Sequence, residues 1–366
     1  MIEYLSLKRI TAMHADEIRE TVRQVVDSGW YLQGESVERF EREYARYMGC
    51  RQCIGVGNGL DALTLIMRAY METGVMKEGD EVIVPANTYI ASILAITENR
   101  LKAVLVEPRI DTFQIDDALI EQAVTPRTRA VMIVHLYGCP AYTERIRETC
   151  QKHGLILIED WAQAHGINKE QEVRPITAAH SFYPGKNLGA LGDGGAVTTN
   201  DDTLAEVVRM LANYGSAEKY SFRYKGRNSR LDEIQAAVLS VKLKYLDEEN
   251  MRRREIAKYY TENITNTDIV LPTPEYCRRS VHHIFPVLCR HRDMLQKQLK
   301  ELGVTTMIHY PVPPHKQQCY NEWNTISLPI TEKIHREELS LPCNQAMTDG
   351  EVERVVEIVN KANAGR

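Results

Sequence analysis

Short apolar runs alternate with amphipathic stretches between about residues 50 and 200 of the chain. This alternation is typical of parallel strands connected by helices that cover both faces of a sheet. We therefore expect an α/β fold with a mainly parallel, mixed sheet between helices. Its strands should include residues 81–84, 103–106, 130–134, 155–158 and 195–198.

Helices are expected where apolar residues recur at the helical period. Asn200-Asp201-Asp202 can cap a helix whose apolar residues are spaced i, i+3, i+4 and i+7, namely Leu204, Val207, Val208 and Leu211. The stretch 231–260 is also helix-rich. Near the C-terminus, the pattern Thr348-x-x-Glu351 is a capping box, which predicts that the last helix begins there.

The length of the chain predicts two domains, because 366 residues exceed what one hydrophobic core usually organises. We expect a large domain over residues 1–245 that includes an N-terminal segment. A smaller α+β domain should follow over residues 246–366, with the segments 281–288 and 304–308 and the C-terminal helix.

Composition and charge narrow the class of partner. With 43% hydrophobic and 26% charged residues the chain has ordinary globular composition, and its net charge of -5 gives no basic face for nucleic acid. The first 15 residues are interrupted by charges, and no later run is apolar enough for a bilayer, so we expect a cytoplasmic protein without a membrane partner. The eight cysteines indicate reduced thiols, and Cys50 and Cys53 lack a second ligand pair, so no metal site is expected.

An apolar strand that stops at Glu159-Asp160 is the first candidate for chemistry. Ligands of open α/β sheets bind where strands end. Asp160 could there hold a buried cation, and the protonated pyridine nitrogen of pyridoxal phosphate is a cation that suits it. The alternative is a structural carboxylate whose hydrogen bonds are satisfied within the protein.

Lys186 is the second candidate, because it lies in a glycine-dense loop between residues 181 and 195. A lysine forms a Schiff base only as the free amine, so it needs a site that lowers its pKa. Glycines let the backbone approach a bulky ligand. A surface lysine in a flexible loop is the alternative, and the aspartate upstream disfavours it.

A glycine turn at Gly57-Asn58-Gly59 leads directly into a third candidate, an amphipathic helix. The free N–H groups and the positive end of the helix dipole at such a start bind phosphate. The turn lacks both the Rossmann fingerprint and the P-loop ending, which disfavours a nicotinamide dehydrogenase.

Together these segments resemble the DegT/DnrJ/EryC1/StrS sugar aminotransferases, which belong to the aspartate aminotransferase-like class. The resemblance covers nearly the whole chain and implies the fold of pyridoxal-phosphate-dependent transferases of fold type I. It rests on ordered motifs at Asp27 to Tyr31, Gly57 to Leu63, Val84 to Tyr89, Val134 to Gly138, Glu159 to Gly166, Ser181 to Gly195, Gly226 to Ala237 and His309 to Pro311.

The resemblance implies that the cofactor is pyridoxal 5′-phosphate. Lys186 would carry it as a Schiff base and act as acid and base, while Asp160 would keep its ring nitrogen protonated. Gln163 would form a hydrogen bond with the hydroxyl of the cofactor ring, and Tyr89 would stack on the face of that ring. The residues expected to hold the cofactor phosphate are Ser181, Gly59, Leu60 and Asn228.

The resemblance also implies a homodimer with shared active sites, since Asn228 is similar to a family residue that reaches the phosphate of the neighbouring subunit. The residues expected to touch the sugar or its diphosphate are Tyr183, Lys219, His309 and Tyr310. The expected reaction moves an amino group from an amino acid, glutamate, to a nucleotide-linked keto-sugar.

We expect the acceptor to be a dTDP-linked 3-keto-6-deoxyhexose, because the segments 105–108 and 308–313 resemble the 3-amino-forming members of the family. A 4-keto-sugar aminotransferase is the nearest alternative. A sugar dehydrase of the same fold resembles the family with histidine in the lysine position, so Lys186 speaks against it. A non-catalytic sensor would have no reason to keep Lys186, Asp160 and Gln163 together.

Three features depart from the family pattern. Leu60 stands where many relatives have threonine, and Trp161 occupies a position that is usually small. The stretch 167–179 is short and lacks a glycine-rich hairpin.

Overall fold

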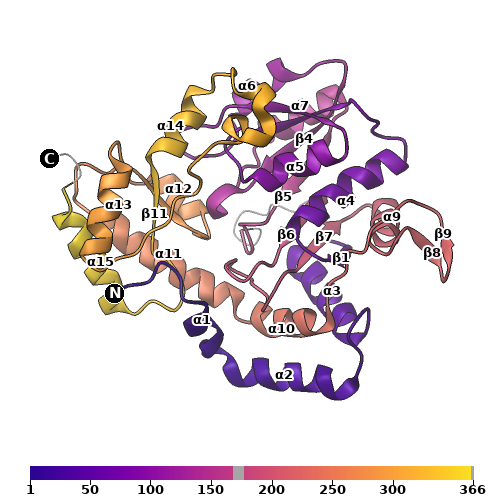
Figure 1. Cartoon of the computed structure of the whole chain (residues 1–366), viewed down its shortest axis with the longest axis horizontal. Coiled ribbons are helices and arrows are strands. Elements are labelled where there is room, and N and C mark those ends of the chain that lie inside the picture. The colour runs from indigo at the N-terminus through magenta and orange to yellow at the C-terminus, as the bar shows by residue number, and fades with distance from the viewer. Residues whose placement is uncertain (168–176, 364–366) are drawn as a thin grey trace.

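The computed structural model describes residues 1–167 and 177–363. Its centre is a seven-stranded sheet in the order β1-β7-β6-β5-β4-β2-β3 (Figure 1). In these residues β7 runs antiparallel to β1 and β6, whereas the other pairings are parallel. The predicted α/β fold with a mainly parallel mixed sheet is therefore confirmed. The strands are β1 (Gln52–Val56), β2 (Glu81–Pro85), β3 (Lys102–Val106), β4 (Thr128–Val134), β5 (Ile156–Asp160), β6 (Thr177–Ser181) and β7 (Gly195–Thr199).

Five of these strands coincide with predicted ones to within one or two residues, and two were not predicted. β6 reads Thr-Ala-Ala-His-Ser and has no apolar run, although its first four residues are buried. The apolar run of β1 is interrupted by Gly55, where a Cβ atom would lie 2.9 Å from Cβ of Leu231. Tertiary packing thus makes strands of two segments that lack the local signal.

The sheet buries alternate side chains on opposite faces, as the period of a strand requires. Val82 and Val84 belong to the core on one face, and Ile83 lies in the core on the other. The first face is covered by α4 (Gly59–Glu72), α5 (Ile90–Glu98) and α9 (Asp202–Ala212). The opposite face is covered by α3 (Glu35–Met48), α6 (Asp117–Ile120), α7 (Glu144–His153) and α10 (Glu233–Leu243).

The predicted cap of α9 is confirmed, since the side chain of Asp201 accepts hydrogen bonds from the N–H groups of Thr203 and Leu204. The capping box at Thr348 and Glu351 is likewise present at the start of α15 (Asp349–Lys361). Both helices bury the apolar stripe that their sequences predict.

A separate core forms in the C-terminal part of the chain, around Phe285, Leu339 and Val355. The short strands β10 (Phe285–Leu288) and β11 (Glu338–Leu341) pair antiparallel beside it. Its helices are α11 (Leu246–Asn263), α12 (Pro274–Arg279), α13 (Arg292–Glu301), α14 (Pro329–Glu337) and α15. The proposed domain boundary between residues 245 and 246 stays a prediction.

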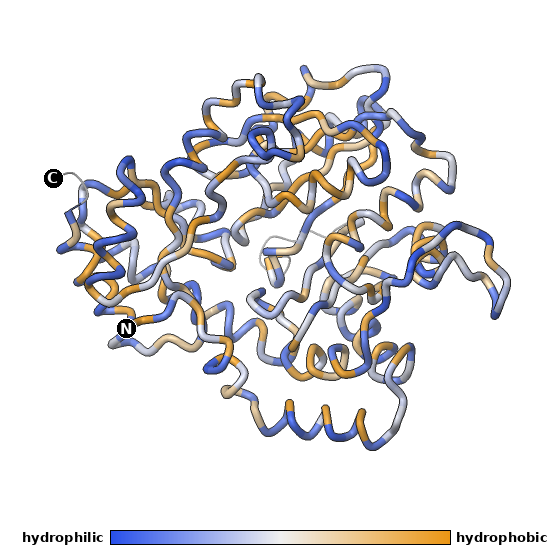
Figure 2. The backbone as a smooth tube through the Cα atoms, in the orientation of Figure 1, coloured by the Kyte–Doolittle hydropathy of each residue, from blue (hydrophilic) through white to orange (hydrophobic). Residues whose placement is uncertain are grey.

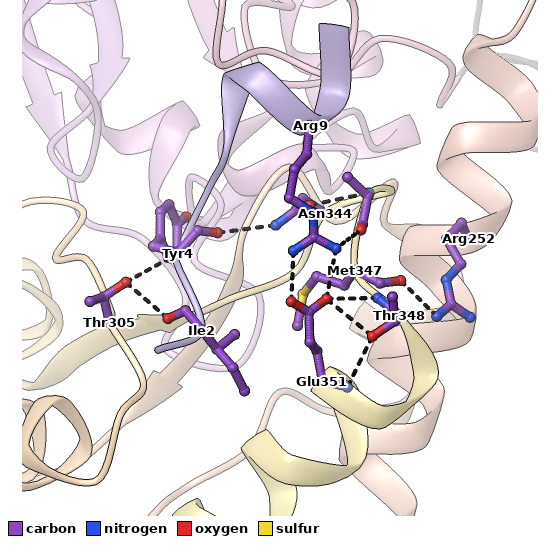
Figure 3. A network of polar contacts seen from close by, with 10 residues as sticks. Ile2, Tyr4, Arg9, Arg252, Thr305, Asn344, Met347, Thr348 and Glu351 are labelled. Carbon is purple, nitrogen blue, oxygen red and sulfur yellow. Dashed lines mark hydrogen bonds and ion pairs between the residues drawn. The ribbon is translucent and has the colours of Figure 1, made fainter. Parts of the chain in front are cut away.

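The N-terminal segment contacts this C-terminal part (Figure 3). Ile2 forms a parallel bridge with Val304, and the hydroxyl of Thr305 accepts the N–H of Tyr4 at 2.7 Å. Arg9 binds both carboxylate oxygens of Glu351 at 2.6 and 2.8 Å. The two ends of the chain are therefore joined.

Helices α1 (Leu7–Met13) and α2 (Ala15–Ser28) lead from that contact to α10, and α2 lies beside α10. Figure 2 shows apolar and polar residues alternating along α2, and its Ile18 packs with Val238 and Val241 of α10. A hairpin of β8 (Ser216–Glu218) and β9 (Ser221–Phe222) projects from the opposite side (Figure 1). In the described part of the chain, no helix is long and apolar enough to cross a membrane.

Candidate active site

The carboxyl ends of neighbouring strands bring the principal predicted residues to one edge of the sheet. Asp160 is the last residue of β5, and Ser181 is the last residue of β6. Tyr89 follows β2 and immediately precedes α5, and Lys186 lies in the loop between β6 and β7. This is the edge at which open α/β sheets bind ligands.

Asp160 is buried and is held in place by two hydrogen bonds. Its Oδ2 accepts from the hydroxyl of Ser92 at 2.9 Å, and its Oδ1 accepts from the N–H of Ala162 at 3.0 Å. Burial raises the pKa of the Asp160 carboxyl, while these bonds and the nearby Lys186 oppose the rise. A carboxylate in such a place is stabilised by a bound cation.

Lys186 is half-buried in the glycine-dense loop. Burial lowers the pKa of its amine to about 8, against the attraction of Asp160. The loop turns tightly here, because the N–H of Lys186 donates to the carbonyl of Tyr183 at 2.8 Å. At Gly189 a Cβ atom would lie 2.4 Å from the carbonyl oxygen of Pro184, so no larger residue fits this turn. The free-amine requirement of a Schiff-base lysine is therefore partly met by the fold.

Gln163 connects the expected cofactor and sugar contacts. Its Oε1 accepts from the N–H of Tyr137 at 2.6 Å, and its Nε2 donates to the hydroxyl of Tyr310 at 2.8 Å. The amide has two N–H donors, so it can hold Tyr310 and still donate to a ligand hydroxyl.

The start of α4 lies against the end of β6. A Cβ atom on Gly59 would be 2.6 Å from Cβ of Ser181, so only glycine permits this approach. The side chain of Asn58 caps the helix at the N–H of Asp61 and leaves the N–H groups of Gly59 and Leu60 facing the helix end. These two N–H groups, with the Ser181 hydroxyl, have the chemistry of a phosphate pocket.

Three of the aromatic residues assigned to ligand contacts line this edge. The rings of Tyr89 and Tyr310 lie 5.1 Å apart, and the side chain of Tyr89 is 52% exposed. Tyr183 is also exposed, in the loop that carries Lys186. His309 is half-buried beside Tyr310, and the positive charge of Lys186 contributes to lowering the pKa of His309.

The structure does not bring Lys219 and Asn228 together with these residues within one chain. Lys219 lies in the turn of the projecting β8–β9 hairpin, where its amine is 5.4 Å from the centre of the Tyr220 ring. Asn228 is exposed and forms a backbone bridge with Asn213, while Ser229 accepts the N–H of Gly57 at 3.0 Å. Asn228 therefore lies one residue from a contact with the turn before α4.

Two of the departures from the family pattern are visible. Leu60 packs against the core beneath the sheet, so its side chain offers no hydroxyl to a phosphate. Trp161 is completely buried, and its indole N–H donates to Glu159 at 3.2 Å beside the ring of His135. In the stretch 167–179, residues 168–176 lie outside the described residues.

Several polar residues around the site were not predicted from the sequence. Ser92 binds Asp160 from the first turn of α5, and His283 contacts Asn187, the neighbour of Lys186, at 3.2 Å. Glu338 and Ser340 of β11 hold His309. Ser92 and Ser340 carry no local signal, because their partners are distant in the sequence.

Three other histidines have protein partners within hydrogen-bonding distance. His282 lies 3.0 Å from the carbonyl of Cys277, and His315 lies 3.1 Å from Glu332. His135 is buried, 2.9 Å from Glu159. Within the described ranges, no group of three or more histidine, cysteine, aspartate or glutamate residues is arranged to hold a metal ion.

Comparison with known proteins agrees with this geometry. Over 99% of both chains, the protein is 54% identical to a dTDP-3-amino-3,6-dideoxy-alpha-D-galactopyranose transaminase of Aneurinibacillus thermoaerophilus. It is 43% identical to a dTDP-3-amino-3,4,6-trideoxy-alpha-D-glucose transaminase of Streptomyces venezuelae, covering 98% of this chain and 96% of the relative.

Solved structures show the same fold. The crystal structure of S. venezuelae DesV in complex with a ketimine intermediate is 43% identical in sequence and superposes with a TM-score of 0.93. The match covers 100% of this chain and 99% of that chain. The fold is that of pyridoxal-phosphate-dependent aminotransferases, which excludes the nicotinamide dehydrogenase alternative. The DegT/DnrJ/EryC1/StrS aminotransferase family model matches residues 12–360, and the chain belongs to this family of enzymes.

Proposed function

We propose that this aminotransferase uses pyridoxal 5′-phosphate to transfer an amino group from L-glutamate to C3 of a dTDP-linked 3-keto-6-deoxyhexose. The observation that carries the proposal is the pairing of a desolvated lysine, Lys186, with a buried carboxylate, Asp160, at one sheet edge. The two relatives above, named as dTDP-3-amino-sugar transaminases, support the sugar and the position of its keto group.

The residues present fit the cofactor. Asp160 is a buried carboxylate with hydrogen-bonding capacity beyond Ser92 and Ala162, which suits a protonated pyridine nitrogen. Gly59, Leu60 and Ser181 would hold the phosphate, with Gln163 on the ring hydroxyl and Tyr89 on the ring face. When bound, the cofactor supplies an electron sink that makes an adjacent carbon acidic.

The protein itself would move the proton. The Nζ of Lys186, with its pKa lowered to about 8, can both accept and return a proton near neutral pH. Asp160 would be ionised when it binds the protonated ring nitrogen, and the bonds from Ser92 and Ala162 would orient its carboxylate. Tyr310 and His309 would orient the sugar above this centre, since Tyr310 is held by Gln163.

A homodimer is part of the proposal. Lys219 lies on a hairpin that projects away from the body of the chain, and Asn228 is exposed, so both could serve the site of a second copy. Completion of the sugar and phosphate pockets would then require two subunits. The product would be a nucleotide-linked deoxyamino sugar for a lipopolysaccharide or another glycan, made in the cytoplasm.

The test combines labelling with turnover. Borohydride reduction followed by peptide mapping should place a phosphopyridoxyl group on Lys186, and Lys186→Ala should lose that label and the yellow colour that glutamate bleaches. The purified enzyme should aminate dTDP-3-keto-6-deoxy sugars. Turnover of the 4-keto compound alone would refute the assignment to C3, and an unlabelled Lys186 would refute the proposal as a whole.

A further inference from the structure

Glu338, Ser340 and His309 form a hydrogen-bonded chain beside the proposed sugar site. Glu338 and Ser340 are two residues apart on β11 and so point to the same side of the strand. The hydroxyl of Ser340 lies 2.5 Å from Oε1 of Glu338 and 2.8 Å from Nδ1 of His309. The backbone bridge between Met307 and Ser340 holds the two segments together.

Glu338 is completely buried, and it receives a second hydrogen bond, from the N–H of His309 to Oε2 at 2.6 Å. Arg292 of α13, whose positive charge acts on this carboxyl, donates to the backbone carbonyls of His335 and Glu338. Burial raises the pKa of Glu338 to about 8, against the effects of Ser340, the His309 N–H and Arg292. The other titratable groups that feel its charge are the hydroxyls of Tyr4, Tyr137, Tyr276 and Tyr310.

His309 is neutral near physiological pH, because burial and Lys186 lower its pKa to about 4. A neutral imidazole carries one proton, on either Nδ1 or Nε2. Nδ1 is engaged by Ser340, and within the described residues no protein partner is recorded for Nε2. The tautomer of His309 therefore determines what Nε2 offers to a ligand.

The protons of the hydrogen-bonded chain formed by Glu338, Ser340 and His309 can be arranged in two ways. When Glu338 is ionised it accepts the Ser340 hydroxyl proton, so Ser340 accepts from Nδ1–H and Nε2 bears a lone pair. When Glu338 is protonated it donates to Ser340, which then donates to Nδ1, and Nε2 carries the proton. One proton at Glu338 thus reverses both hydrogen bonds.

The N-terminal segment supports this arrangement. The ring of Tyr4 lies 5.9 Å from that of His309, and the Tyr4 hydroxyl also interacts with Ser340. Tyr4 is fixed by its N–H bond to Thr305 and by the bond from Asn344 to its carbonyl at 3.2 Å (Figure 3). His309 is further held where its carbonyl accepts the hydroxyl of Tyr137.

We propose that Glu338, acting through Ser340, sets which ring nitrogen of His309 carries the proton, and so whether His309 accepts from or donates to a polar group of the sugar substrate. Glu338 and Ser340 are positioning residues, and of these three residues only His309 touches the ligand. The inference rests on the proposed function, because it takes the ligand beside His309 to be the sugar.

Glu338→Gln mimics the protonated state. The glutamine amide can donate to Ser340 while its oxygen accepts the N–H of His309, so Nε2 should carry the proton at every pH. Ser340→Ala removes the hydroxyl that links Glu338 to His309, and it provides a second variant if Glu338→Gln does not fold. The ring tautomer is read from 15N chemical shifts of histidine-labelled holoenzyme without substrate, with the His309 signals assigned by their loss in His309→Gln.

We expect wild-type His309 to change from Nε2–H at pH 6 to Nδ1–H at pH 9, with no change in Glu338→Gln or Ser340→Ala over that range. The same tautomer in wild type and Glu338→Gln at pH 9 would overturn the inference. So would a pH response that survives in Ser340→Ala. Neither result would alter the labelling of Lys186, so failure of the inference is distinguishable from failure of the proposed function.

Kinetics separate positioning from a purely structural role. In Glu338→Gln, kcat/KM for the keto-sugar should fall about tenfold at pH 9 and less at pH 6. The loss should fall on the sugar half-reaction rather than on bleaching by glutamate. In a His309→Gln background Glu338→Gln should cause no further loss, and an undiminished additional loss there would contradict the proposal.

Discussion

The proposed cofactor side and the proposed sugar side of the site are built differently. Asp160 and Ser181 are the terminal residues of two adjacent strands, and Lys186 follows in the next loop. His309 and Tyr310 lie outside the large sheet and are held by β11, Gln163 and the N-terminal segment. The first side depends on strand ends that are near in sequence, and the second depends on contacts between distant segments.

This difference predicts how strongly substitutions on each side should affect activity. Under the proposed function, substitutions on the cofactor side remove the charge or the nucleophile on which the chemistry would depend. Substitutions on the sugar side alter orientation, so their effects should be smaller and should depend on substrate and pH.

The largest effect should come from Lys186→Ala. Removal of the amine should lower kcat by about a thousandfold or more, because it removes both the covalent attachment and the proton-transfer group. Stopped-flow spectroscopy with glutamate measures the loss. Lys244→Ala, which removes an exposed lysine paired with Glu17, is the control and should retain full activity.

Asp160→Asn should come next, with kcat lowered on the order of 100-fold, because a neutral amide cannot stabilise a cationic ring nitrogen in a buried site. Steady-state turnover checks this. Asp201→Asn is the matched control, since asparagine also caps a helix and Asp201 follows the end of β7 that lies away from Ser181. Equal activity of Asp160→Asn and the wild type would remove Asp160 from the mechanism.

Tyr310→Phe tests the link between the two sides. Loss of its hydrogen bond with Gln163 should lower kcat/KM for the sugar by about threefold to tenfold, mainly through KM. Tyr320→Phe removes a comparable bond to Thr97, 2.8 Å long, and should leave sugar kinetics unchanged. A defect confined to glutamate bleaching would instead place Tyr310 on the cofactor side.

The smallest effect should be on stability. The pKa of Glu338 is about 8 in the folded protein, above its ordinary value of 4.5, so the folded state binds this proton more tightly than the unfolded chain. This contribution to stability is complete below pH 4.5 and is lost as pH rises through 8.

Glu338→Gln should therefore gain a few degrees in Tm relative to the wild type between pH 6 and pH 9, as scanning calorimetry can measure. Glu337→Gln, beside it and paired with Lys333, should show no such pH-dependent gain. A Tm difference that stays constant with pH would exclude an uncommon proton affinity at Glu338.

The principal residues of the proposed cofactor side can be found from the sequence because their signals are local. A buried apolar run ending at Asp160 and a glycine-dense loop around Lys186 are visible without knowledge of the fold. β6 could not be predicted this way, because Thr177 to Ser181 is small and polar and becomes a strand only between β5 and β7.

The sugar side shows the limit of local reasoning. His309 was identified by resemblance, but Glu338 was not, because the two are 29 residues apart and meet only when β11 forms. On the cofactor side Ser92 was missed for the same reason, since 68 residues separate it from Asp160. The roles of Lys219 and Asn228 stay predictions, because they depend on a second subunit.

The contacts between the N-terminal segment and the C-terminal part of the chain have a consequence for biosynthesis. Ile2 and Arg9 are synthesised well before their partners, Val304 and Glu351, which lie far along the chain. The segment that carries Ile2 and Arg9 therefore cannot dock until these partners have been synthesised. Tyr4 can take its place beside His309 only after Thr305 and Asn344, which hold it there, have been added to the chain.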